Sequence, residues 1–432
     1  MNNMIYFKIK EKRIWSVLLM VCFNLITAQS GSLSLEECYH LAKENYPMIK
    51  KMDIIDKTAD FTVENANKRY FPQVSFSGQA TYQSQTINFS NALGSLPINM
   101  ALPSLSKDQY KIQGEVDQLL YDGGKIRNQK DLIKANAELQ TQNLETNLYA
   151  IRQRINMIFF SILLMDSQLK QNEINKANLQ TQVQKTEAAL KYGVAYRSNL
   201  DELKAEIINI DMMSTEYKTN RDTYLKMLSV FIGKNVSSSE ELQLPDSEVF
   251  QTEMKRPEIK SFELQKSIYD LQESQLKSDL LPKVSAFVQG AYGRPTLNII
   301  ENKFGPWFIA GVRFNWSLES LYTSSNQKEI LKLNREAVNA DKETFLLNTK
   351  LDLTQQDEQI KKYNELIRQD EKAIALRESV RKSAEAQLSN GVITTHEYIQ
   401  KTNAENLARQ TLILHQIQLL QAKYNQKFIT GN

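Results

Sequence analysis

The sequence has few of the residues that interrupt helices and few of those that carry most enzyme chemistry. Its 432 residues include 14 glycines, 9 prolines and 3 histidines. Scarce glycine and proline favour long uninterrupted helices, and scarce histidine leaves little material for metal centres or general-base catalysis. Lysine plus arginine number 53 against 50 aspartates plus glutamates. This balance gives no electrostatic reason to expect a nucleic acid partner.

The first 28 residues have the features of a secretory signal peptide. Basic residues precede an apolar run, and Ala28 supplies a small residue for cleavage. Lipid attachment at Cys22 is the alternative, but Val21 is bulkier than the small residue that normally precedes a lipidated cysteine. We therefore expect cleavage near Ala28, which leaves Cys38 without an intramolecular disulfide partner. No later apolar stretch approaches the ~20 residues of a membrane helix, so only strands would enter a membrane.

The rest of the chain contains one pattern twice. The segment YFPQVS at 70–75 returns as LLPKVS at 280–285, and the pair GV at 193–194 returns at 391–392. A repeat of this length is a duplicated half-structure rather than a solenoid unit. We expect a first repeat over 29–232, a linker or equatorial segment over 233–256 and a second repeat over 257–432.

Four long segments have the periodicity of helices. Apolar residues recur at spacings of three and four, as in Ile151, Ile155, Ile158 and Ile162. The predicted long helices cover about 125–191, 196–232, 325–389 and 395–430. Such seams are typical of coiled coils, and here they predict two helical hairpins. At about 1.5 Å per residue, the longest helices would reach roughly 100 Å.

Between the helices, apolar and polar residues alternate, as Phe308, Ala310 and Val312 do in the second repeat. The predicted strands cover about 73–87, 108–120, 283–292 and 306–317. About ten residues of tilted strand span the apolar band of a bilayer. Strands of a soluble sandwich show the same alternation, so the pattern by itself leaves both environments open.

Two features favour the membrane. Aromatic residues cluster at the strand ends, as they do in interfacial girdles. Four strands cannot close a barrel, and lipid does not tolerate an open sheet edge. A membrane sheet would therefore require several copies, two supplying eight strands and three supplying twelve. The residues expected to face lipid are Phe76, Tyr82, Phe308, Phe314 and Trp316.

The order of these parts resembles the TolC-type outer-membrane efflux ducts of Gram-negative bacteria. The resemblance covers the whole mature chain and depends on the duplication, the hairpin tips and the segment LYDGGKIR at 120–127, which is similar to the family's strand-to-helix turn. In physical terms, Asp122 would cap backbone amides while Gly123 and Gly124 take left-handed backbone angles. The second repeat has ESLYTS at 319–324 and no glycine pair, so its turn must be built differently.

The resemblance implies a fold that is mainly α with a membrane β-barrel part. Duplicated helical hairpins would form a periplasmic α-barrel, and four strands per chain would complete a trimeric, 12-stranded barrel in outer-membrane lipid. The resemblance also implies a homotrimer that works with a periplasmic adaptor (membrane fusion) protein and an inner-membrane pump. Substrates would pass through this exit duct passively, with the energy supplied by the pump.

The hairpin tips and the residues after the second tip are the sites that the resemblance assigns. The glycines of the tips would end helices in the left-handed conformation. The resemblance implies that the adaptor's own hairpin docks at Gly193, Val194, Ala195, Gly391, Val392 and Ile393. It further implies a periplasmic gate at the positions of Glu397 and Gln400. A plain solvated surface position is the alternative for Glu397.

We find no catalytic constellation in the sequence. The three histidines, His40, His396 and His415, are far apart and lack a Cys or His partner at metal-ligand spacing. We therefore expect no enzyme activity, no cofactor and no metal. Two other hypotheses remain open beside the efflux duct. One is an exit duct for type I protein secretion, and the other is a soluble periplasmic coiled-coil scaffold.

Overall fold

The computed structural model describes residues 32–87, 105–236, 242–245 and 253–432. The predicted signal peptide, with Cys22, lies outside the described residues, as does part of the predicted linker. In chain order the elements are α2 (Leu35–Asn45), η1 (Pro47–Ile49), α3 (Lys50–Asn67), η2 (Lys68–Tyr70), β1 (Gln73–Tyr82), β2 (Asp108–Tyr121), α5 (Lys125–Lys191), α6 (Arg197–Ile232), α7 (Pro257–Asp279), β3 (Lys283–Arg294), β4 (Gly305–Asn315), α8 (Glu319–Ser389) and α9 (Thr395–Thr430).

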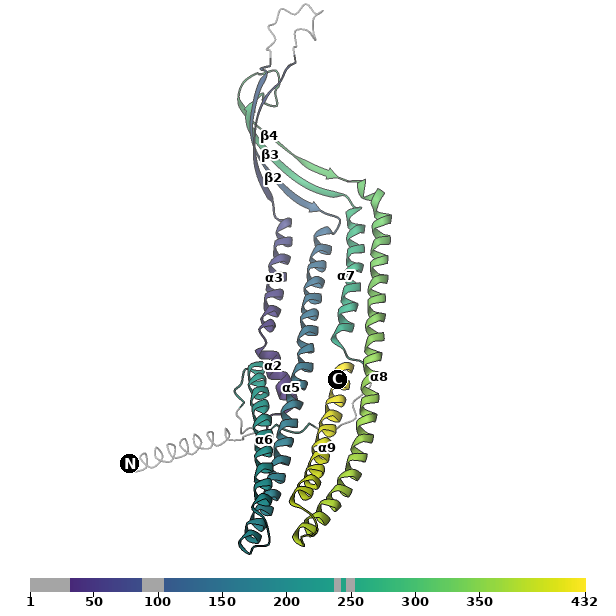
Figure 1. Cartoon of the computed structure of the whole chain (residues 1–432). Coiled ribbons are helices and arrows are strands. Elements are labelled where there is room, and N and C mark those ends of the chain that lie inside the picture. Colours follow the sequence, from purple (N-terminus) through teal and green to yellow (C-terminus); the bar gives the residue numbers. More distant parts are fainter. Residues whose placement is uncertain (1–31, 88–104, 237–241, 246–252) are drawn as a thin grey trace, which may run out of the picture. The chain divides into compact units, whose positions relative to one another are not determined.

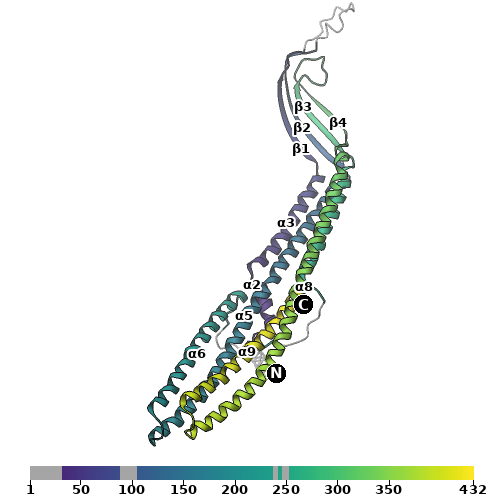
Figure 2. The same cartoon turned by 45° about the vertical axis from the view of Figure 1, so that its right-hand side comes forward.

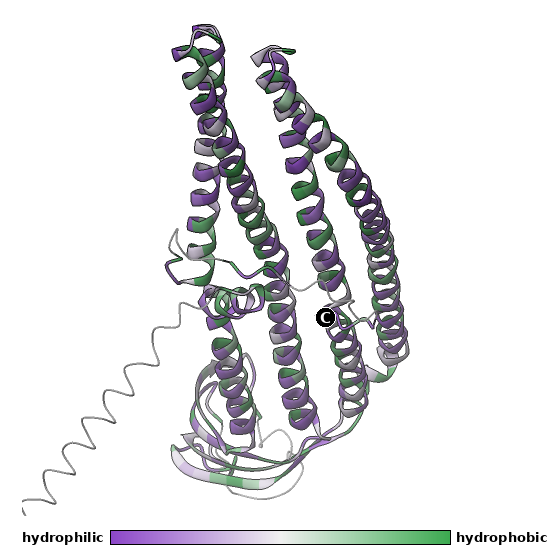
Figure 3. Cartoon of the chain, turned by 90° about the horizontal axis from the view of Figure 1, so that it is seen from below, coloured by the Kyte–Doolittle hydropathy of each residue, from purple (hydrophilic) through white to green (hydrophobic). Residues whose placement is uncertain are grey.

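Helices α5 and α8 are the longest elements, with 67 and 71 residues. Neither contains a proline or glycine that would interrupt the backbone hydrogen bonds. Hydrophobic and hydrophilic residues are interleaved along them (Figure 3), as expected for helices that bury only a stripe of their surface. Helix α6 lies beside α5, and α9 lies beside α8, in both views of the chain (Figures 1 and 2).

Helix α8 begins at Glu319 rather than near 325, so the predicted start was wrong. The amide of Leu321 donates to the carbonyl of Leu318 at 3.1 Å, which begins the helical turn directly after the strand. The second repeat therefore passes from strand to helix without the glycine pair of the first repeat.

The four strands form one antiparallel sheet in the order β1-β2-β3-β4 (Figure 1). The central pair, β2 and β3, comes from different repeats and is separated in the sequence by the helices α5, α6 and α7. Strands β1 and β4 stand at the two edges. Strand β1 ends at Tyr82 rather than near 87, because its ladder with β2 ends at the pair Tyr82 and Asp108. Strand β4 ends at Asn315, two residues before the predicted end.

The two faces of the sheet differ in chemistry because side chains alternate along each strand. The apolar face carries large exposed side chains, including Phe76 at 82% and Phe308 at 74% exposure. Tyr82 and Phe314 share this face through the register of the ladder. Trp316 follows the end of β4, and its indole Nε1 donates to the carbonyl of Leu280 at 3.0 Å. The opposite face carries most of the charged and amide side chains.

The chain folds into two compact units, and each unit takes segments from both repeats. Unit 1 consists of residues 1–49, 147–255 and 349–432, and unit 2 consists of residues 50–146 and 256–348. The sheet lies in unit 2. The core of unit 1 joins α5, α6, α8 and α9 through Leu179, Leu203, Ile210, Ala384, Tyr398 and Ile399. The duplication is therefore not a division into two domains.

Within the described residues, one window of α5 is long and apolar enough to cross a membrane by length and composition. Half of that window is buried in the protein. A buried apolar stripe of this kind is what a core helix of a bundle requires.

Candidate functional sites

The strand-to-helix turn of the first repeat is built around Asp122. One carboxylate oxygen accepts the amide of Gly124 at 2.9 Å, and the other accepts the amide of Ile126 at 2.7 Å. These are amides at the start of α5 that have no partner within the helix. Gly123 and Gly124 have φ angles of +69° and +82°, which favour glycine. The turn thus joins the sheet to the long helix within three residues.

The two hairpin tips share one backbone design. After α5, the amide of Val194 donates to the carbonyl of Ala189 at 3.0 Å, and the amide of Gly193 donates to that of Leu190 at 3.1 Å. At the second tip, the amides of Val392 and Gly391 donate the two corresponding hydrogen bonds, at 2.9 Å and 3.0 Å. This pattern is the Schellman motif, with a left-handed glycine past the helix end. Gly193 and Gly391 both take this left-handed conformation, with φ angles of +73° and +70°.

The surfaces of the tips differ. The first tip exposes Tyr192, Val194 and Tyr196 at 85%, 78% and 79%. The second tip exposes Val392 at 70%, and it has Asn390 and Thr394 where the first has tyrosines. Asn390 bonds locally, because its side-chain amide donates to the carbonyl of Ala386 at 2.9 Å. The first tip is therefore an aromatic surface and the second a polar one.

Glu397, the predicted gate residue, closes a capping box at the start of α9. Its carboxylate accepts the backbone amide of Thr394 at 2.8 Å, while the Thr394 hydroxyl accepts the amide of Glu397 at 3.2 Å. These hydrogen bonds to Thr394 lower the pKa of the Glu397 carboxyl. The pattern Thr-x-x-Glu at 394–397 is the sequence signature of this cap and is the signal that could have found it. Gln400 contacts the ring of His396 at 3.0 Å.

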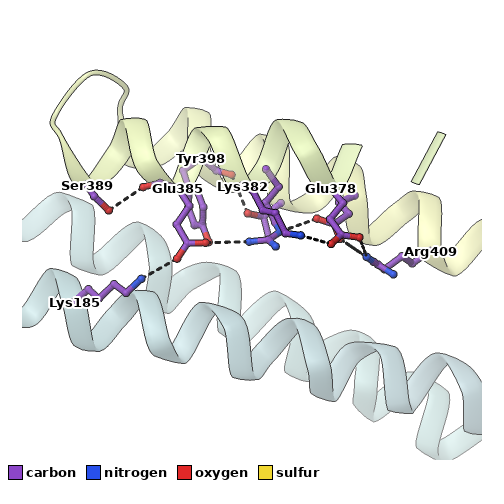
Figure 4. A network of polar contacts seen from close by, with 10 residues as sticks. Lys185, Glu378, Lys382, Glu385, Ser389, Tyr398 and Arg409 are labelled. Carbon is purple, nitrogen blue, oxygen red and sulfur yellow. Dashed lines mark hydrogen bonds and ion pairs between the residues drawn. The ribbon is translucent and has the colours of Figure 1, made fainter. Parts of the chain in front are cut away.

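An ion network links the helices above the second tip (Figure 4). Glu405, with its side chain 8% exposed, lies between Arg381 and Arg409, whose guanidinium groups donate at 2.7 Å and 2.8 Å. Glu385 accepts from Arg381 at 3.2 Å and from Lys185 of α5 at 2.8 Å. Lys185 thus ties the first hairpin to the second within unit 1. The hydrogen bond from Lys185 is the main cause that lowers the pKa of the Glu385 carboxyl.

This network is not visible in the sequence, for a physical reason. Neighbours one helical turn apart, such as Glu405 and Arg409, are visible as spacings in a sequence. The bonds from Arg381 to Glu405 and from Lys185 to Glu385 cross between helices. Only the packing of the hairpins brings those partners together.

Unit 1 also buries a ladder of side-chain amides between α5, α6 and α9. Asn172 is fully buried, accepts the amide of Gln410 at 2.9 Å and donates to the hydroxyl of Ser214 at 3.1 Å. Gln168 donates to the backbone carbonyl of Gln410 at 3.3 Å. Buried amides of this kind fix the register of packed helices. The interruption of an apolar seam by asparagine is the signal that could have found them.

The polar face of the sheet carries its own ion cluster in unit 2. Arg313 of β4 donates to Glu115 at 2.8 Å and to Asp117 at 3.0 Å, both on β2. Ser285 of the intervening strand β3 donates to Asp117 at 3.0 Å. The cluster therefore crosslinks three strands on the face opposite Phe314. Among the described residues, no group of three His, Cys, Asp or Glu side chains is arranged to hold a metal ion.

Known proteins resemble this chain in sequence and in fold. Residues 38–233 match the family model described as outer membrane efflux protein. Over these residues the chain is similar to the outer membrane efflux protein family. A comparison with curated proteins finds no match.

Solved channels share the fold over almost the whole chain. The CmeC outer membrane channel of Campylobacter jejuni superposes with a TM-score of 0.62 at 12% identity, over 92% of this chain and 85% of that one. VceC of Vibrio cholerae superposes with a TM-score of 0.65 at 12% identity, over 92% and 96%. The open state of MtrE of Neisseria gonorrhoeae gives 0.64 at 11% identity, over 92% and 89%.

The family match and the shared fold agree on the function in outline. Both support an outer-membrane exit duct for an efflux system, which extends from the outer membrane into the periplasm. The predicted fold class, mostly helical with four strands per chain, is confirmed. The hypothesis of a soluble periplasmic scaffold is not supported. The relatives are channels rather than enzymes.

Proposed function

We propose that three copies of this chain close one continuous duct, with twelve strands in the outer membrane and paired hairpins in the periplasm. The observation that carries the proposal is the four-stranded sheet, whose edges β1 and β4 have no strand partner among the described residues. An open edge is not tolerated in lipid. Pairing β4 of one copy with β1 of the next satisfies both edges and closes a barrel.

The two faces of the sheet support the same arrangement. Phe76, Tyr82, Phe308 and Phe314 are 63% to 82% exposed on one face, and Trp316 is 53% exposed beside it. An apolar outward band facing lipid and a polar interior are the features of membrane barrels. In this arrangement the apolar face contacts lipid, and the face with Arg313 borders the lumen.

We propose that the tips receive a periplasmic adaptor, which joins the duct to an inner-membrane pump. Gly193, Val194 and Ala195 form one docking point, and Gly391, Val392 and Ile393 form the other. A side-chain Cβ at either glycine would meet no atom within 4 Å, so both tips are open to a partner. The duct conducts passively, because in this assembly the pump supplies the energy.

The periplasmic aperture is gated, in this proposal, by a ring of Glu397 with Gln400 nearby. The Glu397 carboxylate is exposed as well as engaged with Thr394. Three copies of an anionic side chain around a pore favour cations. The capping box gives the same residue a structural role, so a test must separate charge from capping.

The experiment that tests the assembly is detergent extraction followed by gel electrophoresis and planar-bilayer recording. We expect a heat-sensitive trimer band and discrete conductance steps. Recovery in the soluble fraction without detergent, or a monomer without conductance, would contradict the proposal. Deleting the gene and measuring both drug sensitivity and the secreted proteome distinguishes efflux of small molecules from type I protein secretion.

A further inference from the structure

The polar face of the sheet ends, beside the strand-to-helix turns, in two neighbouring cavities of unit 2. Their volumes are about 380 Å³ and 250 Å³. Asp117, Lys283 and Asn315 line both of them. Lys283 and Asn315 face each other in the ladder between β3 and β4. The larger cavity has room for a small organic molecule.

The carboxylates that line the cavities are already engaged. Asp117 accepts from Arg313 and from Ser285, each at 3.0 Å. Asp122 accepts two backbone amides at the start of α5, at 2.9 and 2.7 Å. The Asp279 carboxylate accepts a hydrogen bond from the Lys125 ammonium at 2.6 Å. An arriving cation would have to compete with each of these contacts.

Two of the cationic side chains that line the cavities, Lys283 and Arg69, are not paired with a carboxylate in the described part of the chain. Within the residues that the structure describes, Lys283 has no acidic partner, and its side chain is exposed. Arg69, which lines the larger cavity, donates to the neutral amide of Gln129 at 2.8 Å. The groups in the cavities that can still bind a ligand are therefore mainly cationic hydrogen-bond donors.

We propose that this corner of the sheet is a binding station for small organic anions, with Lys283 as its main contact and Arg69 as a second one. A carboxylate, sulfonate or phosphate group would accept from the Lys283 ammonium, and the Asn315 amide lies opposite. The inference depends on the proposed function, because that arrangement places the polar face along the lumen. Three copies would give three stations around the duct, through which the substrates pass.

The test uses pyranine, a fluorescent trisulfonate, and fluorescence anisotropy with the detergent-solubilised protein. Lys283→Gln removes the open ammonium and should weaken binding by at least about ten-fold. Lys283→Arg keeps the charge and should stay within about two-fold of the natural protein. The matched control is Lys303→Gln, which removes the same charge from a lysine paired with Glu301 in the segment between β3 and β4. It should leave the affinity unchanged.

A second variant tests the direction of the effect. Asp117→Asn removes an acidic partner of Arg313, so a further cationic donor becomes available and pyranine should bind more tightly. A site that merely collapsed would bind less tightly in this variant as well. Looser binding by Asp117→Asn would therefore contradict the anion station.

Other outcomes also decide the matter. Failure of the natural protein to bind pyranine would overturn the inference, and so would equal weakening by Lys283→Gln and Lys303→Gln. Conductance in planar bilayers is recorded on the same preparations. Channels that conduct but bind no pyranine would refute the anion station alone, whereas pyranine binding without any conductance would refute the duct.

Discussion

The carboxylate of Glu397 accepts the backbone amide of Thr394 at 2.8 Å and its hydroxyl at 3.0 Å. The predicted gate residue is thus also the residue that closes the N-terminal cap of α9. A variant that removes the side chain changes both properties at once. A useful pair of variants removes the charge in both members and the cap in only one.

Glu397→Gln and Glu397→Ala form that pair. Glutamine still completes a capping box, whereas alanine does not. If the charge gates the pore, both variants raise the single-channel conductance of reconstituted trimers and reduce its sensitivity to divalent cations. If only the cap matters, the alanine variant alone differs. Natural currents in the glutamine variant would rule out the charged gate, and thermal melting would report the loss of the cap in the alanine variant.

The turn before α5 allows a prediction from two adjacent glycines. Both have left-handed φ angles, so alanine at either position is strained by about 1–2 kcal/mol. A Cβ at Gly123 would also lie 2.7 Å from the Cβ of Leu281, while at Gly124 it would meet nothing within 4 Å. We therefore expect Gly123→Ala to lose roughly 1–3 kcal/mol more than Gly124→Ala. Equal losses of unfolding free energy would show that the contact with Leu281 is unimportant.

The bond between Lys185 and Glu385 predicts a pH dependence. The pKa of Glu385 is lowered from its usual 4.5, chiefly by the hydrogen bond from Lys185. A lowered folded-state pKa stabilises the protein above pH 4.5, and this contribution disappears as the pH falls through the lowered pKa. Lys185→Met should therefore be less stable than the natural protein at pH 7, and the difference should shrink as the pH falls below the lowered pKa of Glu385.

Thermal melts monitored by circular dichroism would measure this difference. The matched control is Lys382→Met, because Lys382 bonds to Glu378 within the same helix and joins no second hairpin. We expect a smaller loss for the control at pH 7. A stability difference for Lys185→Met that does not change with pH would contradict the assigned role of the carboxylate.

The second tip predicts a separation of docking from assembly. Gly391 lies at a φ of +70° with open space around it. Gly391→Asn should be close to the natural protein because asparagine tolerates this conformation. Gly391→Trp adds bulk where the adaptor is proposed to dock, so export should be lost while trimers still form. Normal export by the tryptophan variant would count against docking at this tip.

Neighbouring residues on opposite faces of β1 test which face meets lipid. Arginine on the lipid face near the midplane of the bilayer costs about 2–4 kcal/mol, whereas the lumenal face tolerates charge. Phe76→Arg should therefore prevent stable insertion, and Ser77→Arg should insert normally. The yield of heat-sensitive trimer in outer-membrane fractions measures both. A reversed order would show that the faces were assigned the wrong way round.

Local features of the fold were predictable from the sequence because they depend on residues close together in the chain. The periodicity of apolar residues gave the long helices, and Asp122 with Gly123 and Gly124 marked the start of α5. The start of α8 was misplaced because the second repeat lacks the glycine pair that marks the turn of the first repeat. A carbonyl of Leu318 that accepts the amide of Leu321 was sufficient instead.

Long-range pairings were not predictable in the same way. The bonds from Arg381 to Glu405 and from Arg313 to Asp117 each join different helices or strands. Their sequence spacing carries no period that marks them. Lys283 likewise stands out only in the folded chain, because the acidic side chains near it are hydrogen-bonded to other groups.

The sequence by itself determined the duplication, the lengths of the helices and the two-faced character of the strands, because each of these follows from short-range patterns of apolar and polar residues. The tertiary structure alone decided that β2 and β3 join the two repeats in one sheet, and that each compact unit mixes both repeats. It also decided which charges are paired. Such contacts depend on how distant segments pack, and packing is a property of the whole chain rather than of any segment.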